Sequence, residues 1–88
     1  MYKIVKRNYN KKRGKVLRTY YYRDCVLNFL NFNIKDIQNN IKDRDDFIDI
    51  ERNNKLVTTI YPTDGEIEYW QIKNAIWYVE NLKVKESD

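Results

Sequence analysis

Positively charged side chains are concentrated in the first quarter of the chain, which is also rich in tyrosine. Residues 1–23 contain nine Lys or Arg and no Asp or Glu, whereas residues 24–88 contain eight basic and thirteen acidic side chains. The net charge of +4 therefore combines a strongly basic segment with an acidic one. Cations spaced along a surface neutralise phosphates, and aromatic rings stack on the bases of single strands. The pattern favours binding to nucleic acid.

The predicted nucleic-acid site consists of eight cations and three tyrosines of this segment. Its members are Lys6, Arg7, Lys11, Lys12, Arg13, Lys15, Arg18 and Arg23, together with Tyr9, Tyr20 and Tyr22. In the competing interpretation, the tyrosines pack in a sheet and the cations only solvate its outer face. No known DNA-binding or RNA-binding motif matches the segment, so this prediction depends on the charge pattern alone.

A second group of large aromatic side chains lies near the other end of the chain. It consists of Tyr69, Trp70, Trp77 and Tyr78. Residues of this kind dominate the energetics of protein interfaces. Trp70 and Trp77 share a face only if the segment is helical. The alternative prediction is therefore a protein–protein inhibitor, anchored by these aromatics and steered by its basic segment toward an acidic partner. From the sequence, core and interface positions remain equally open for these side chains.

Catalytic and metal-binding chemistry has little support. The chain has no His and a single Cys25, which excludes Cys/His zinc sites and His-based catalysis within one chain. Cys25 is expected to be a small buried residue. The acidic cluster Asp43, Asp45, Asp46, Asp49 and Glu51 lacks the Gly and spacing of a calcium loop. We interpret it as a solvated strand edge, and we expect no enzymatic activity, cofactor or metal.

The basic segment has the composition of a β-hairpin. Residues 2–7 and 15–22 are rich in Ile, Val, Leu and Tyr, and residues 10–14 form a polar stretch that ends in Gly14. We therefore predict a basic hairpin over residues 1–23, whose loop carries Lys11, Lys12 and Arg13.

A β-meander is predicted over residues 46–72. Its first two strands flank Asn53-Asn54, and Asn tolerates the positive φ of a two-residue turn. Residues 62–65 suit a second turn closed by a left-handed Gly, and residues 66–69 alternate like a third strand.

Helix is the competing interpretation for residues 64–83. Thr63 and Glu66 have the spacing of a capping box, which marks a helix start. Under either interpretation, residues 74–83 form an aromatic element that must be buried or bound to a partner. The charged tail, residues 84–88, is expected to fray.

The segment between the two hairpins, residues 24–43, is compatible with two structures. Its apolar residues recur at three- and four-residue steps, at Leu27, Leu30, Ile34, Ile37 and Ile41. This spacing predicts one helix with Asp24 as N-cap. The alternative is a strand over residues 26–32, followed by a helix over residues 34–42 that Asn33 caps. Helix over residues 34–42 is common to both.

A shift of forty residues aligns two parts of the chain with each other. It aligns residues 15–33 with residues 55–73 and gives four identities, including Thr19 with Thr59 and Asp24 with Asp64. The similarity suggests a tandem βββα pseudo-repeat. The sequence as a whole predicts a single α+β domain over residues 1–88, with an antiparallel sheet of four to six strands and one or two short helices.

Composition also suggests a cellular context. The sequence shows no signal peptide or membrane-spanning stretch, so we expect a cytoplasmic, intracellular protein. Small size, residues with A/T-rich codons and the lack of catalytic groups favour an accessory or inhibitory factor of a phage or other mobile element. Its partner would be nucleic acid or a ribonucleoprotein groove. The alternative partner is a host defence nuclease complex, as for anti-CRISPR or anti-restriction inhibitors. The sequence leaves the oligomeric state open, a homodimer included.

Overall fold

Four antiparallel strands form one sheet in the computed structural model, which describes residues 1–83. The strands are β1 (Tyr2–Asn8), β2 (Lys15–Tyr20), β3 (Asp46–Arg52) and β4 (Lys55–Ile60). Their order is β2-β1-β3-β4, so the first strands of the two hairpins pair in the centre and their second strands form the edges. The predicted α+β class with an antiparallel sheet is confirmed. The predicted frayed tail, residues 84–88, lies outside the described residues.

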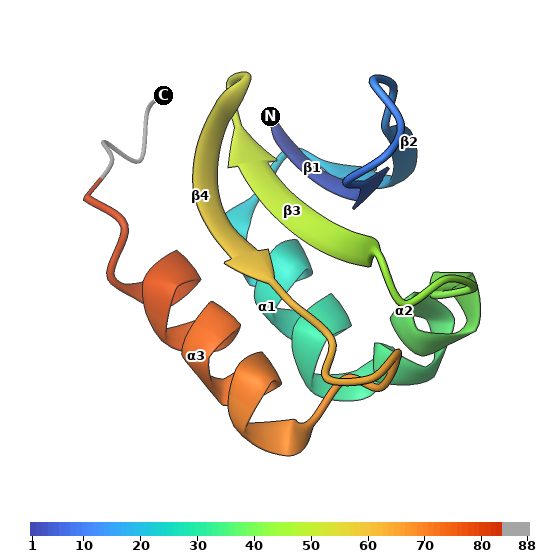
Figure 1. Ribbon diagram of the computed structural model, residues 1–88. Helices are drawn as coiled ribbons and strands as arrows, with labels where there is room; N and C mark the ends of the chain where they lie inside the picture. Colours follow the sequence, from blue (N-terminus) through green and yellow to red (C-terminus); the bar gives the residue numbers. More distant parts are fainter. Residues whose placement is uncertain (84–88) are drawn as a thin grey trace.

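Three helices lie against one side of this sheet (Figure 1). They are α1 (Arg23–Phe32), α2 (Ile34–Asn40) and α3 (Tyr69–Glu80). Alternate residues of the central strands point toward the helices and form the core with α1 and α3. The largest side chains that are fully enclosed are Ile4, Leu30, Ile37, Ile48, Ile50 and Ile60, and the larger rings of Tyr2 and Phe29 are almost as deeply buried. The other side of the sheet, here called the open face, carries none of the described helices.

The predicted Asn53-Asn54 turn is confirmed. Asn53 and Asn54 have φ values of 51° and 66°, and Arg52 pairs with Lys55 across the turn. Two left-handed residues give the twist that matches antiparallel strands, and Asn tolerates this conformation. The turn therefore sets the register of the adjoining residues, and a bulge between Ile50 and Glu51 shifts the register over the rest of β3 and β4.

The predicted third strand of the meander, residues 66–69, does not form. Thr63 and Glu66 exchange backbone hydrogen bonds of 2.8 and 3.0 Å around Asp64 and Gly65, but the pairing ends there. A capping box of Glu68 and Gln71 then starts α3. The helical interpretation of this segment is therefore correct, although its start differs from the predicted pair of Thr63 and Glu66. Burial of residues spaced by three or four, at Ile72, Ala75 and Val79, outweighs the local alternation.

The strand predicted over residues 26–32 does not form either. Val26, Phe29 and Leu30 are buried on one side of α1, and Phe32 points into solvent. Tyr22, and not Asp24, occupies the N-cap position of α1. The chain does not continue as one helix, because Asn33 separates α1 from α2. α2 matches the predicted helix and ends two residues earlier.

Each half of the chain contains two strands and not the three of a βββα unit. The order is a hairpin followed by helix in both halves, with α1 and α2 in the first and α3 in the second. The two edge strands, β2 and β4, lie forty residues apart in the sequence and match the predicted alignment. The internal similarity itself stays a prediction.

Candidate nucleic-acid interface

The basic hairpin folds as the strand pattern predicts. β1 and β2 pair antiparallel from Tyr2 opposite Tyr20 to Lys6 opposite Lys15, and the connection carries Lys11, Lys12 and Arg13. Gly14 is required where this connection returns to the sheet. A Cβ at Gly14 would lie 2.7 Å from Val5 Cγ1, and atoms do not approach so closely without a clash. The absence of a side chain therefore lets the loop pack against β1.

Hydrogen bonds to the start of β3 anchor the loop. Asn8 Nδ2 donates to Asp46 Oδ1 at 2.7 Å, and Asn10 Nδ2 donates to Asp45 Oδ2 at 2.8 Å. The Asn10 backbone N–H also donates to Asn8 Oδ1 at 2.8 Å. These contacts place the loop cations at one end of the two central strands.

Five of the eight predicted cations line one hollow of about 230 Å³ at this end of the hairpin, which we call the basic hollow. They are Lys6, Arg7, Lys11, Arg13 and Lys15. Asp46 is the single carboxylate among the described residues that line it. Lys12 is exposed in the same loop. The positive charge of the hairpin is therefore partly focused on one concave surface.

The protein's own carboxylates pair with two of these cations. Arg7 Nη2 lies 2.7 Å from Glu51 Oε2, and Arg7 Nε lies 2.9 Å from Asp49 Oδ2. The hydrogen bond with Glu51 is the main cause that raises the pKa of Arg7, so its guanidinium stays charged. Lys6 Nζ lies 3.4 Å from Asp46 Oδ2. Arg7 and Lys6 are thus held in position, and part of their charge is cancelled.

Two further predicted cations serve the fold away from the basic hollow. Arg18 Nη2 lies 3.1 Å from Asp36 Oδ2, and Arg18 Cζ lies 5.4 Å from the ring centroid of Phe29. Arg23 donates from Nη2 to the backbone carbonyl of Leu82 at 2.7 Å, just beyond the end of α3. Four cations in the hairpin's loop and at the start of β2 have no carboxylate partner within residues 1–83. They are Lys11, Lys12, Arg13 and Lys15.

The three predicted tyrosines lie in different environments. Tyr20 is half-buried, and its ring centroid lies 6.1 Å from that of Phe29 in the core. Tyr22 is exposed at the start of α1. Tyr9 lies beside the loop and contacts two aromatic residues that the sequence prediction missed, Phe47 and Tyr61. Regular pairing from the Asn53-Asn54 turn would place Phe47 opposite Ile60. A bulge between Ile50 and Glu51 shifts the register and brings Tyr61 beside Phe47, and pairing of β1 with β3 brings Tyr9 to them.

The aromatic group of α3 is a surface feature. Tyr69, Trp70, Trp77 and Tyr78 are each more than half exposed, while the buried face of α3 is formed by other residues. Trp70 and Trp77, seven residues apart, lie on the same side of the helix as expected. Trp77 and Tyr78 meet edge to face with ring centroids 5.1 Å apart.

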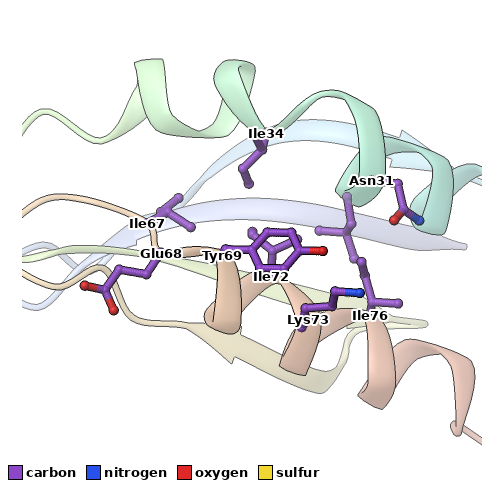
Figure 2. Close-up of a pocket in the computed structure, with 9 residues that line it drawn as sticks. Asn31, Ile34, Ile67, Glu68, Tyr69, Ile72, Lys73 and Ile76 are labelled. Atoms are coloured by element: carbon purple, nitrogen blue, oxygen red, sulfur yellow. The ribbon is translucent and has the colours of Figure 1, made fainter.

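An apolar cavity of about 320 Å³ lies between α3 and the α1–α2 segment, and Tyr69 is the member of the aromatic group that lines it (Figure 2). Its apolar lining residues are Leu30, Ile34, Ile67, Ile72 and Ile76. Tyr69 and Lys73 belong to the same lining, and Lys73 Nζ lies 5.3 Å from the Tyr69 ring centroid. The cavity is large enough for an apolar side chain of a partner.

Two sequence expectations about the remaining groups are corrected. The acidic cluster does not form a solvated edge, because β3 is a central strand whose Asp46 and Asp49 are buried. Cys25 is exposed and not buried. Within residues 1–83, no three His, Cys, Asp or Glu side chains are arranged to hold a metal ion.

None of the described helices is suited to span a bilayer, since the longest, α3, has twelve residues and a span needs about twenty. No protein-family model matches the chain, and neither a curated protein nor a solved structure shows detectable similarity to it.

Proposed function

We propose that the protein binds nucleic acid, free or within a ribonucleoprotein, without catalysing a reaction on it. The basic hollow carries this proposal. Five cations line it, and Lys11, Arg13 and Lys15 among them have no carboxylate partner within residues 1–83. Phosphates are the natural ligands of such a surface, because its cations neutralise them and release the counterions condensed on the nucleic acid. The assignment to a mobile element depends on composition alone and stays a prediction.

The unpaired cations also define how strongly salt should oppose binding. Each neutralised phosphate contributes about −0.7 to the log–log salt slope for a single strand and about −0.9 for a duplex. Four contacts, from Lys11, Lys12, Arg13 and Lys15, therefore predict a slope of roughly −3. Fluorescence anisotropy with labelled oligonucleotides at several salt concentrations measures this slope. Binding that does not respond to salt, or no binding at low salt, would contradict the proposal.

A second candidate function is favoured by the surface of α3. Four large aromatic side chains are more than half exposed there, and one of them, Tyr69, lines the apolar cavity together with Lys73. Exposed aromatic groups next to a pocket are typical of protein interfaces, in which they act as anchors. The candidate is an inhibitor or assembly factor that binds an acidic protein, such as part of a host defence nuclease complex. The positively charged hairpin would accelerate that association.

Replacing Trp70 and Trp77 by alanine separates these two functions. Both indoles are largely outside the core, so we expect the free energy of unfolding to change by less than about 1 kcal/mol. Oligonucleotide affinity should stay within about twofold of the parent, because the basic hollow is untouched. Urea denaturation followed by circular dichroism, with anisotropy, measures both quantities. A large loss of stability would make the indoles structural, and a large loss of oligonucleotide affinity would extend the nucleic-acid surface to α3.

A further inference from the structure

Three aromatic rings gather at one end of the open face, and we call Tyr9, Phe47 and Tyr61 the aromatic cluster. The ring centroids of Tyr9 and Phe47 lie 4.7 Å apart, and those of Phe47 and Tyr61 lie 5.7 Å apart. Tyr9 and Tyr61 are nearly parallel, with an interplanar angle of 5° and centroids 6.5 Å apart. Tyr9 is 65% exposed and Tyr61 is 54% exposed. A large part of both rings is therefore available to a ligand.

The aromatic cluster adjoins the basic hollow. Arg7, which lines the hollow, pairs directly with Phe47 in the register of β1 and β3. Tyr9 follows Asn8, another lining residue, and precedes the loop that carries Lys11. One ligand of a few nucleotides can therefore contact both surfaces, because single-strand sites span about 4 to 16 nucleotides.

Charge distinguishes the two surfaces. Asp49 pairs with Arg7 and accepts a hydrogen bond of 2.7 Å from Thr59 Oγ1 on the open face. Asp45 adjoins the cluster, because its backbone carbonyl accepts a hydrogen bond of 3.2 Å from the Tyr9 N–H. Partial desolvation raises the pKa of Tyr9, and the neighbouring Tyr61, Asp45 and Asp49 raise it further. Carboxylates repel phosphates, so the uncharged faces of bases suit the cluster and phosphates suit the hollow.

We infer that the nucleic acid bound by the basic hairpin is single-stranded, with its phosphates along the basic hollow and unpaired bases stacked on Tyr9 and Tyr61. The inference rests on the proposed function and names the substrate class of the same site. A duplex keeps its base faces stacked inside the helix and cannot offer them to an aromatic surface. A single strand can present successive bases, and stacking tolerates any sequence because every base has an aromatic face.

The test compares four labelled probes with the full-length protein. They are a single-stranded DNA, a single-stranded RNA, a duplex, and an abasic strand with the same phosphate number as the single-stranded DNA. We expect both single strands to bind at least tenfold more tightly than the abasic strand at ~0.1 M salt, since a stacked base contributes about fivefold or more. Comparison of the single-stranded DNA with the single-stranded RNA shows whether the sugar affects the affinity.

Variants identify the surface responsible. The double substitution Tyr9→Ala and Tyr61→Ala should weaken single-strand binding at least tenfold and leave abasic-strand binding within about twofold. Tyr21→Ala with Phe32→Ala is the matched control, because both rings are exposed and belong neither to the two surfaces nor to the predicted site. The pair Tyr9→Phe and Tyr61→Phe should retain binding, because the rings remain. Circular dichroism verifies that every variant is folded, and the comparison of probes on the parent protein needs no variant.

The outcomes separate the two proposals. If the duplex and the abasic strand bind as tightly as the single strands, the inference is wrong and the proposed function stands. If none of the probes binds at low salt, both are wrong. If the Tyr21 and Phe32 control loses as much affinity as the Tyr9 and Tyr61 variant, stacking does not occur at the aromatic cluster and the inference is also wrong.

Discussion

Replacing Lys11, Lys12 and Arg13 by glutamine should weaken oligonucleotide binding about 100-fold at ~0.1 M salt. Three lost phosphate contacts remove about 0.7 each from the log–log slope for a single strand, which corresponds to roughly two decades of affinity at this salt concentration. The slope should become shallower by about 2. All three side chains are exposed in the loop, so the fold should persist. Anisotropy at several salt concentrations measures both the affinity and the slope.

A control with the same net charge tests whether position matters. Lys35, Lys55 and Lys73 are exposed and lie outside the basic hairpin, and their replacement by glutamine removes the same three charges. We expect this variant to lose less than about fivefold in affinity, because long-range attraction is screened beyond ~10 Å at 0.1 M salt. Equal losses in the two variants would mean that net charge alone drives binding. The basic hollow would then have no special role.

The second large effect is expected for Asp46→Ala, which should lower the free energy of unfolding by about 3 kcal/mol. The Asp46 carboxylate is 4% exposed and is the acceptor of several groups at once. Asn8 Nδ2 donates at 2.7 Å, and the backbone N–H groups of Lys42 and Asp43 donate at 2.9 and 3.0 Å. Alanine leaves these donors and the Lys6 ammonium without their partner in a largely buried site.

Urea denaturation followed by circular dichroism measures this loss. Asp46→Asn is the informative control, because its side-chain carbonyl still accepts one hydrogen bond but carries no charge. We expect this substitution to lower the free energy of unfolding by about half as much as Asp46→Ala does. Asp46 also bonds to Asn8, which anchors the loop, so both variants should weaken oligonucleotide binding. An alanine variant as stable as the parent would show that the Asp46 network does not stabilise the fold.

The same carboxylate predicts how stability depends on pH. Burial by itself would raise the pKa of Asp46, but the hydrogen bonds from Asn8, Lys42 and Asp43, and the charge of Lys6, outweigh it and lower that pKa. A carboxyl whose pKa is lower in the folded protein stabilises the fold above its unfolded pKa of about 3.9. That contribution disappears as the pH falls through the folded pKa. The stability difference between the parent and Asp46→Asn should therefore shrink below about pH 4.

Local signals predicted the hairpins better than the helices. Asn53-Asn54 specifies its turn because left-handed φ values at two successive residues are acceptable to few residue types. The loop from Asn10 to Gly14 likewise lies between two strands rich in apolar residues. For residues 66–69 the alternation predicted a strand, but these residues contain the Glu68 cap and the first helical residue. Short apolar patterns fit strands and helices alike, so the burial of the neighbouring helical positions decided the outcome.

The candidate site was predicted in composition and not in geometry. Every cation of the basic hollow was among the predicted residues. Phe47 and Tyr61 were missed, because their contact with Tyr9 requires three strands from distant parts of the chain to lie in order. Arg18 and Arg23 were included only for their charge. Their partners are Asp36 in α2 and the backbone carbonyls of Glu80, at the end of α3, and Leu82, just beyond it, and the sequence did not specify the positions of these groups.

The amino-acid sequence by itself determined the charge asymmetry and the two hairpins, because each depends on residue identity or on neighbours a few positions apart. Only the tertiary structure decided which charges remain for a partner. Arg7 meets Glu51 across 44 positions and Asn8 meets Asp46 across 38, both through the pairing of β1 with β3. Contacts at such separation depend on how the whole sheet assembles around its core, and local patterns do not encode that assembly.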